Sequence, residues 1–217
     1  MEKHVLTVGS FAVNCTILSE DDRAYLVDPG QEADRLVAEL EKRALHPVAI
    51  LLTHAHFDHI GAVPELQRRY PGLPVYLGEA DHAVITHPFN AYPPDYPAIA
   101  KPSDLRPATD LQRLLPSVRV IDTPGHTPGG VCYYFAEDRR LLSGDTLFAR
   151  SIGRTDLPGG SLTTLAASLE VLKQLPDETE VIPGHGDLTT IGNERRHNPF
   201  LKEPQEEIRP PKSEGLS

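Results

Sequence analysis

One short segment of the chain concentrates residues that bind metal ions, in the pattern His54-x-His56-x-Asp58-His59. Histidine is the commonest metal ligand in proteins, and carboxylates complete many such sites. The segment follows a continuous apolar run at residues 48–52, which predicts a fully buried strand. A loop that leaves a strand can direct several side chains toward one cavity. We therefore expect these four residues to bind metal.

Three further candidate ligands lie far from this segment along the chain. His126, Asp145 and His185 each come just after an apolar run, where a strand is expected to end. A glycine beside each of them permits the tight backbone geometry that directs a side chain inward. Seven donors are too many for one tetrahedral zinc ion, but they suit two ions that share a bridging carboxylate and a water. The sequence therefore predicts a centre for two metal ions.

Short apolar runs that end in turn residues alternate with amphipathic segments. We expect strands at residues 4–8, 15–18, 24–27, 48–52, 73–77, 118–121, 131–135, 140–142 and 180–182. We expect helices at residues 32–42, 61–70 and 162–172, the last with Ser161 as its N-cap. The proline-rich residues 87–116 predict a long irregular loop, either a lid or a plain surface connection. Because strands and helices interleave, the fold class is α/β (or α+β), with helices that cover the faces of a sheet.

Composition restricts the partners and the compartment. The 217 residues carry a formal net charge of −10, which argues against nucleic acid or a membrane surface as the main partner. Two cysteines, no apolar run of membrane-spanning length and no leader-like start lead us to expect a cytoplasmic protein. We expect one domain over residues 1–203 and a disordered tail over residues 204–217. The oligomeric state is left open.

Taken together, these motifs resemble the metallo-β-lactamase superfamily over nearly the whole chain, to residue 203. The segment Asp145-Thr146-Leu147-Phe148, followed by Gly153-Arg154-Thr155-Asp156, is similar to the glyoxalase II (hydroxyacylglutathione hydrolase) and persulfide dioxygenase branch. Residues 193–200, Asn-Glu-Arg-Arg-His-Asn-Pro-Phe, are similar to the short bacterial glyoxalase II-like hydrolases. The resemblance implies a four-layer αβ/βα sandwich with the metals at one edge between the sheets.

The resemblance also implies a role for each candidate ligand. The first metal site would consist of His54, His56 and His126, the second of Asp58, His59 and His185, with Asp145 as the bridge. Asp28, in Val27-Asp28-Pro29-Gly30, also matches a family motif and would orient a ligand histidine. An ordinary turn carboxylate is the alternative interpretation of Asp28.

The reaction expected from this centre is hydrolysis of a small-molecule thioester such as S-lactoylglutathione. Two divalent ions, zinc by expectation and iron or manganese as alternatives, would lower the pKa of a bridging water from 15.7 toward about 7. Asp58 would orient the resulting hydroxide toward the thioester carbonyl. A thiolate is a good leaving group, so no nucleophilic side chain is required.

Four residues are candidate substrate contacts. Arg150 and Arg154 could engage a substrate carboxylate, and Tyr92 and Tyr96 could line the pocket. A salt bridge that organises the loop explains Arg154 equally well. Recognition of glutathione is left open, because longer glyoxalase II enzymes hold it through a C-terminal helical domain to which the resemblance does not extend.

The main alternative is a persulfide dioxygenase with a single iron. His54, His126 and Asp145 would then form a two-histidine, one-carboxylate face with open positions for oxygen and substrate. A non-catalytic metal-holding scaffold is disfavoured by the complete set of donors. A nuclease is disfavoured because the sequence lacks a basic surface and an added nucleic-acid domain.

Overall fold

The apolar runs in the first half of the chain pair into a six-stranded sheet; the computed structural model describes residues 1–201. Its strands, in spatial order, are β1 (Glu2–Val8), β2 (Val13–Glu20), β3 (Arg23–Val27), β4 (His46–Leu51), β5 (Val75–Leu77) and β6 (Leu105–Pro107). The first three pair antiparallel, whereas β3 to β6 pair in parallel. The carboxyl ends of β3, β4 and β5 therefore lie at one edge of the sheet.

The second half of the chain forms a five-stranded sheet with the order β13-β12-β9-β8-β7. Its strands are β7 (Val118–Asp122), β8 (Val131–Phe135), β9 (Arg140–Gly144), β12 (Glu180–Pro183) and β13 (Thr189–Thr190). Strand β8 is antiparallel to both β7 and β9, and β12 is parallel to β9. As a result, β7, β9 and β12 run in one direction and end at a common edge.

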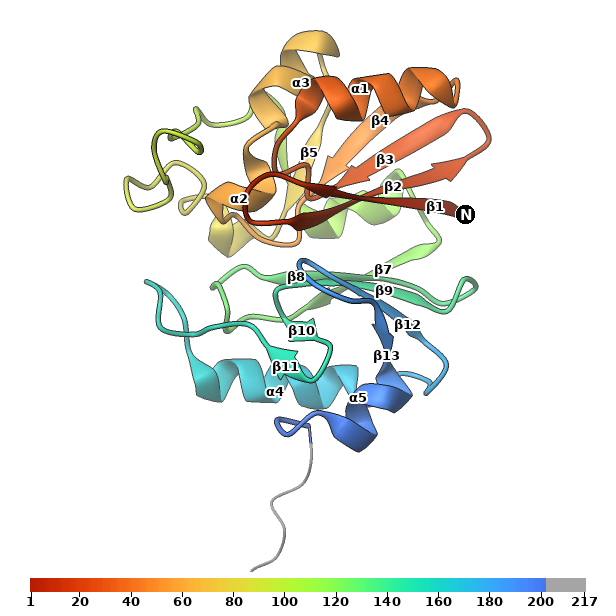
Figure 1. The fold of residues 1–217 in the computed structure, drawn as a ribbon, viewed down its shortest axis with the longest axis vertical. Helices are drawn as coiled ribbons and strands as arrows, with labels where there is room; N and C mark the ends of the chain where they lie inside the picture. The colour runs from red at the N-terminus through yellow and green to blue at the C-terminus, as the bar shows by residue number, and fades with distance from the viewer. Residues whose placement is uncertain (202–217) are drawn as a thin grey trace, which may run out of the picture.

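The helices cover the outer faces of the two sheets, which gives four layers (Figure 1). Helices α1 (Ala33–Lys42) and α3 (Val63–Arg69) lie on the first sheet, and α4 (Leu162–Leu172) and α5 (Ile191–His197) lie on the second. The remaining elements are the one-turn helix α2 (Phe57–Ile60), the 3₁₀ helices η1 (Glu79–Asp81) and η2 (Ala108–Arg113), and the short hairpin β10 (Leu147–Phe148) and β11 (Ser151–Ile152). The predicted fold class and four-layer αβ/βα sandwich are confirmed.

Three apolar cores separate the four layers. Leu36 and Leu40 of α1 pack with Ile50 in the core beneath the first helical layer. Leu51 packs with Tyr133 in the core between the sheets, and α4 covers a third core on the far side of the second sheet. Ile50 and Leu51 are buried on opposite faces of β4, which explains why the sequence of this strand contains a continuous apolar run.

Hydrogen bonds join the two sheets at the edge where the candidate ligands lie. The Tyr133 hydroxyl donates to the carbonyl of Leu52 (2.9 Å), and the backbone N–H of Val131 donates to the carbonyl of Thr53 (2.8 Å). On the other side, the backbone N–H of Asn14 donates to the carbonyl of Gly184 (2.7 Å). These bonds fix the loops of one sheet against those of the other.

The structure corrects the expectation of an irregular loop over residues 87–116. This segment contains β6, which extends the parallel sheet through Val75 paired with Leu105, and η2, whose Leu111 is buried between the sheets. Strands β10, β11 and β13 and helix α5 were also not predicted, because each is too short to show a clear periodicity. The Ser161 N-cap is confirmed, since its hydroxyl accepts a hydrogen bond from the backbone N–H of Thr164 (3.2 Å).

The predicted disordered tail at residues 204–217 lies outside the described residues, and the domain boundary at residue 203 stays a prediction. Within residues 1–201, no helix is long and apolar enough to span a membrane.

Candidate metal centre

Every candidate ligand lies in a segment that leaves the carboxyl end of a strand. Strand β4 ends at Leu51; His54 and His56 follow it, and Asp58 and His59 lie in the one-turn helix α2. A single loop thus supplies four of the seven donors.

The other three donors come from the second sheet. His126 lies in the loop after β7, Asp145 comes directly after β9, and His185 follows β12. Since these three strands run in the same direction, their ends meet the β4 loop at one edge. The structure therefore brings together all seven residues that the sequence predicted as ligands.

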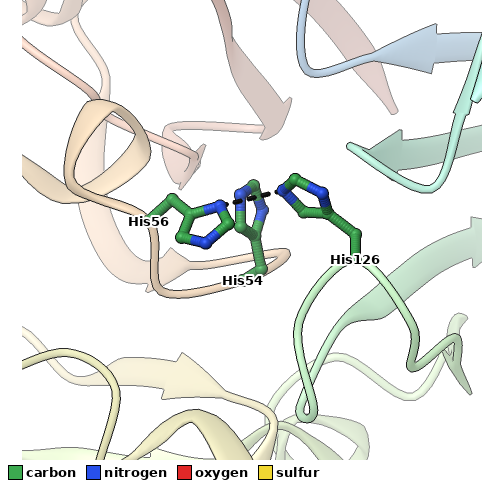
Figure 2. A group of neighbouring side chains, drawn as sticks. All are labelled: His54, His56 and His126. Carbon is green, nitrogen blue, oxygen red and sulfur yellow. Dashed lines mark hydrogen bonds between the residues drawn. The ribbon is translucent and has the colours of Figure 1, made fainter. Parts of the chain in front are cut away.

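His54, His56 and His126 form one compact group, with ring centroids 4.6–4.8 Å apart (Figure 2). The Nδ1 atom of His56 lies 2.9 Å from the Nε2 atom of His126. A tetrahedral ion with bonds of 2.0–2.1 Å would hold two nitrogens about 3.3 Å apart. The observed separation is close to that value, so the three rings can contribute to a common ion.

Asp58, His59 and His185 form a second group. The Nε2 atoms of His59 and His185 are 3.2 Å apart, and Oδ2 of Asp58 lies 3.3 Å from Nε2 of His185. Asp145 lies between the two groups: its Oδ1 is 3.4 Å from Nε2 of His59, and its Oδ2 is 3.5 Å from Nε2 of His126. This is the arrangement that a carboxylate shared by two ions requires.

Three carboxylates give the centre an excess of negative charge. Asp28 and Asp58 are buried and Asp145 is nearly so, and within residues 1–201 their only ion-pair partners are histidines. Burial of anions without matching cations is strongly unfavourable. Divalent cations would supply the missing positive charge.

The histidines divide into two electrostatic classes. Burial and the neighbouring imidazoles lower the pKa of His54 well below its usual range and that of His56 to about 3, so both are neutral and able to bind metal. At His59, burial is outweighed by Asp145, Asp58 and Asp28, which raise its pKa to about 10. For Asp58, burial is outweighed by His59 and His185, and its pKa falls to about 2. Metal binding at the second group must therefore displace a proton from His59.

Asp28 supports the centre from behind the ligands. Its carboxylate accepts hydrogen bonds from the backbone N–H of Thr53 (2.7 Å) and the hydroxyl of Thr53 (2.6 Å). Its Oδ2 also lies 3.0 Å from Nδ1 of His59, which leaves Nε2 of that ring facing the second group. Asp28 is therefore in the position that the family motif implied, and it is more than a turn carboxylate.

The residues present fit two divalent ions. Nε2 of His54 and Oδ1 of Asp145 are buried and have no hydrogen-bond partner among residues 1–201. An unpartnered buried polar atom costs about 1–3 kcal/mol, which a bound cation would offset. Imidazole and carboxylate donors without thiolate suit zinc, iron or manganese.

Comparison with known proteins identifies the family of this fold and donor set. Residues 8–185 match the sequence model of the metallo-beta-lactamase superfamily. The chain belongs to this superfamily.

Two relatives match nearly the full length of this superfamily member. It is 38% identical to the probable metallo-hydrolase YqgX of Bacillus subtilis, over 90% of this chain and 95% of the relative. It is 33% identical to the hydroxyacylglutathione hydrolase GloC of Haemophilus influenzae, over 93% of this chain and 98% of the relative. These relatives and the family indicate a metal-binding hydrolase.

Solved structures of the superfamily superpose closely on the chain. BLEG-1, described as a B3 metallo-beta-lactamase, gives a TM-score of 0.82 at 38% identity and covers 93% of this chain and 100% of its own. TTHA1623, solved in a di-iron-bound form, gives a TM-score of 0.80 at 41% identity and covers 91% of this chain and 100% of its own. ETHE1 of Myxococcus xanthus gives a TM-score of 0.70 at 28% identity and covers 92% of this chain and 84% of its own.

The two tyrosines predicted to contact substrate differ in exposure. Tyr92 is 55% exposed and packs on Phe57, which lies between the ligands His56 and Asp58 in the sequence. Tyr96 is only 1% exposed, and its hydroxyl accepts a hydrogen bond from the backbone N–H of Phe11 (3.4 Å). The structure therefore corrects the expectation for Tyr96: it supports the loop at Phe11 from within and presents almost no surface.

The two arginines predicted to contact substrate are exposed. The Arg154 side chain pairs with Asp156 (2.7 Å), in agreement with the alternative of a loop-organising salt bridge. The backbone carbonyl of Arg154 lies 2.7 Å from Nδ1 of His126 and so orients that ligand ring. Arg150 donates its backbone N–H to the buried Glu194 (2.6 Å), while its side chain remains in solvent.

The sequence interpretation missed three residues around the centre. Phe11 is 40% exposed, and its carbonyl lies 2.8 Å from Nδ1 of His185. Asp81 and Asn90 are buried and bind the backbone of Ala55, between two ligand histidines. For Asp81, a signal was available: it follows the strand that neighbours β4 in a parallel sheet, so both strands end at the same edge.

Proposed function

We propose that the chain is a dinuclear metal-dependent hydrolase that cleaves a small-molecule thioester. The observation that carries this proposal is the position of Asp145, with one carboxylate oxygen beside His59 and the other beside His126. A carboxylate so placed can serve two ions at once. When bound, the two ions would supply Lewis acidity toward the carbonyl and activate water at neutral pH.

The chain's own residues have three tasks in this scheme. His54, His56 and His126 would hold one ion, and Asp58, His59 and His185 would hold the other, with Asp145 shared. Asp58, held ionised by the neighbouring imidazoles, can accept a hydrogen bond from the attacking water and keep it directed at the carbonyl carbon. A thiolate leaves without help from a general acid, so the scheme requires none.

No side-chain nucleophile competes with water in this scheme. Both cysteines are buried, and burial raises the pKa of Cys132 to about 11 and that of Cys15 still further. A protonated buried thiol is a poor nucleophile. This supports direct attack by water on the substrate.

Two relatives favour this substrate class and metal number. GloC is named a hydroxyacylglutathione hydrolase, and it matches the chain at 33% identity over nearly its full length. TTHA1623, 41% identical, was solved in a di-iron-bound form. We propose zinc or iron for this chain, because both accept the imidazole and carboxylate donors.

A persulfide dioxygenase remains the second candidate. The motif Gly153-Arg154-Thr155-Asp156, which is similar to that of the persulfide dioxygenase branch, favours it. That activity would use His54, His126 and Asp145 around one iron. The four remaining donors, His56, Asp58, His59 and His185, would then have no assigned task, which is why we favour the hydrolase.

The decisive assay offers the metal-loaded protein three substrates in parallel. We expect release of glutathione from S-lactoylglutathione, without oxygen uptake on glutathione persulfide and without opening of a β-lactam ring. Oxygen uptake on the persulfide would favour the second candidate. Hydrolysis of the β-lactam without hydrolysis of the thioester would contradict the proposed substrate class and indicate an amide substrate.

A further inference from the structure

A buried carboxylate outside the ligand set joins the two loops that carry the first metal group. Asp81 is the last residue of η1, directly beyond β5, and its side chain is completely buried. The backbone N–H of Ala55 donates to its Oδ2 (3.0 Å), and the backbone N–H of Gly129 donates to its Oδ1 (2.6 Å). Ala55 stands between His54 and His56, and Gly129 lies three residues after His126.

Asn90 holds the other side of the same peptide. Its side-chain amide donates to the carbonyl of Ala55 (2.6 Å) and, more weakly, to that of Ile85 (3.4 Å). Both polar backbone groups of Ala55 are thus bound by buried side chains from outside the ligand loop. This fixes the orientation of the peptide units on either side, from which the rings of His54 and His56 project.

The contact between the segment of Asp81 and the His126 loop has no room for a side chain at Gly78 or Gly129. A Cβ atom placed on Gly129 would lie 2.4 Å from the backbone nitrogen of Asp81 and 2.8 Å from its Cβ. A Cβ on Gly78 would lie 1.9 Å from the carbonyl oxygen of Gly129. The two segments are therefore held in close backbone contact, and the two carboxylate oxygens of Asp81 bind an N–H group of each ligand-bearing loop.

We infer that Asp81 is a positioning residue that presets the spacing of His54, His56 and His126 and so determines the metal affinity of the first group. The inference rests on the proposed dinuclear centre. A carboxylate is required, because both partners are N–H donors; an amide of the same shape would turn its own NH₂ toward one of them. Within residues 1–201, the hydrogen bonds of the Asp81 carboxylate go to the loops of the first group and to no residue of the second group, so we expect a selective effect.

Single-site backgrounds separate the two groups. His185→Ala leaves the first group, His126→Ala leaves the second, and Asp81→Asn is added to each. Cobalt(II) is titrated into the metal-free proteins in competition with a chelator, and binding is followed by the visible absorption of the ion. We expect Asp81→Asn to weaken cobalt binding 10–100-fold in the His185→Ala background, the usual effect of losing a group that orients ligands. In the His126→Ala background we expect no change.

Matched variants control for charge and for folding. Asp122→Asn removes an exposed carboxylate close by and should change neither titration. Asn90→Ala, which leaves Asp81 intact, should weaken the first group by a smaller factor and provides the test if Asp81→Asn does not fold. Unchanged cobalt affinity of the first group in both variants, or equal weakening of both groups, would overturn the inference. If the wild-type protein binds two cobalt ions but hydrolyses no thioester, the proposed function is refuted and the inference about Asp81 is not.

Discussion

Oδ2 of Asp28 lies 3.0 Å from Nδ1 of His59, deep beneath the surface of the metal centre. The contact fixes the ring so that Nε2 points at the second group, and it raises the affinity of that nitrogen for a cation. Asp28 is held in turn by the backbone and hydroxyl of Thr53. A residue outside the candidate ligand set thus sets the orientation of a candidate ligand.

Replacing Asp28 should weaken metal binding without removing any ligand. We expect Asp28→Ala to lower the affinity of the second group, which contains His59, for its metal ion about 10–100-fold. Competition with a chelator measures this affinity. Thr53→Val keeps the backbone contact and loses only the hydroxyl, so its effect should be several-fold smaller. Equal affinities in wild type and Asp28→Ala would show that the contact with His59 does not matter.

Gly184 lies against two ligands. A Cβ atom there would come within 2.2 Å of Oδ1 of Asp145 and 2.7 Å of Cε1 of His59. Gly184→Ala must displace one of them, and we expect at least a tenfold loss of affinity at the second group, as for other disrupted ligand shells. The control is Gly186→Ala, two residues away, where nothing lies within 4 Å but φ is +75°. It should cost about 1–2 kcal/mol of unfolding free energy and leave metal binding intact.

The metal-free protein should lose stability as the pH rises. The carboxylates around His59 outweigh its burial and raise its pKa from 6.5 to about 10, so the folded state holds this proton more tightly than the unfolded state does. The stabilisation is fully present below pH 6.5 and disappears as the pH approaches about 10. The melting temperature of chelator-treated protein should fall across this window, and His59→Gln should reduce the slope. A flat profile for the wild type would contradict the ion pairs assigned to His59.

Asp145 should matter to both ions. We expect Asp145→Ala to bring metal content close to zero per chain and to abolish hydrolysis, because the same carboxylate reaches both groups. His185→Ala removes a ligand of one group only and should retain about one ion per chain. The comparison uses elemental analysis after equal dialysis. Retention of both ions by Asp145→Ala would mean that the carboxylate is not shared.

The candidate ligands and the strands that carry them could be identified from the sequence because both depend on local patterns. The apolar run before His54 predicts a strand buried on both faces, and Ile50 and Leu51 do pack into different cores. His126, Asp145 and His185 follow similar runs. Strand ends in parallel arrangements share an edge, so their convergence follows from topology.

The segments and side chains that surround the candidate ligands could not be predicted in the same way, because their positions depend on contacts between distant parts of the chain. Strand β6 is recognisable only once Leu105 pairs with Val75, which lies 30 residues earlier. Tyr96 resembles a pocket residue in sequence, yet it packs beneath Phe11, more than 80 residues away. The hydrogen bonds of Asp81 and Asn90 to the backbone of Ala55 likewise join distant segments, although the place of Asp81 after the strand next to β4 follows from the topology.

The most direct test of the dinuclear hydrolase is metal content measured on the same preparation as S-lactoylglutathione hydrolysis. Our account predicts about two ions per chain at full activity, as expected for seven donors, with activity lost on chelation and regained as the second ion is restored. A single tightly held iron per chain, together with oxygen uptake on glutathione persulfide and no thioester cleavage, would contradict it.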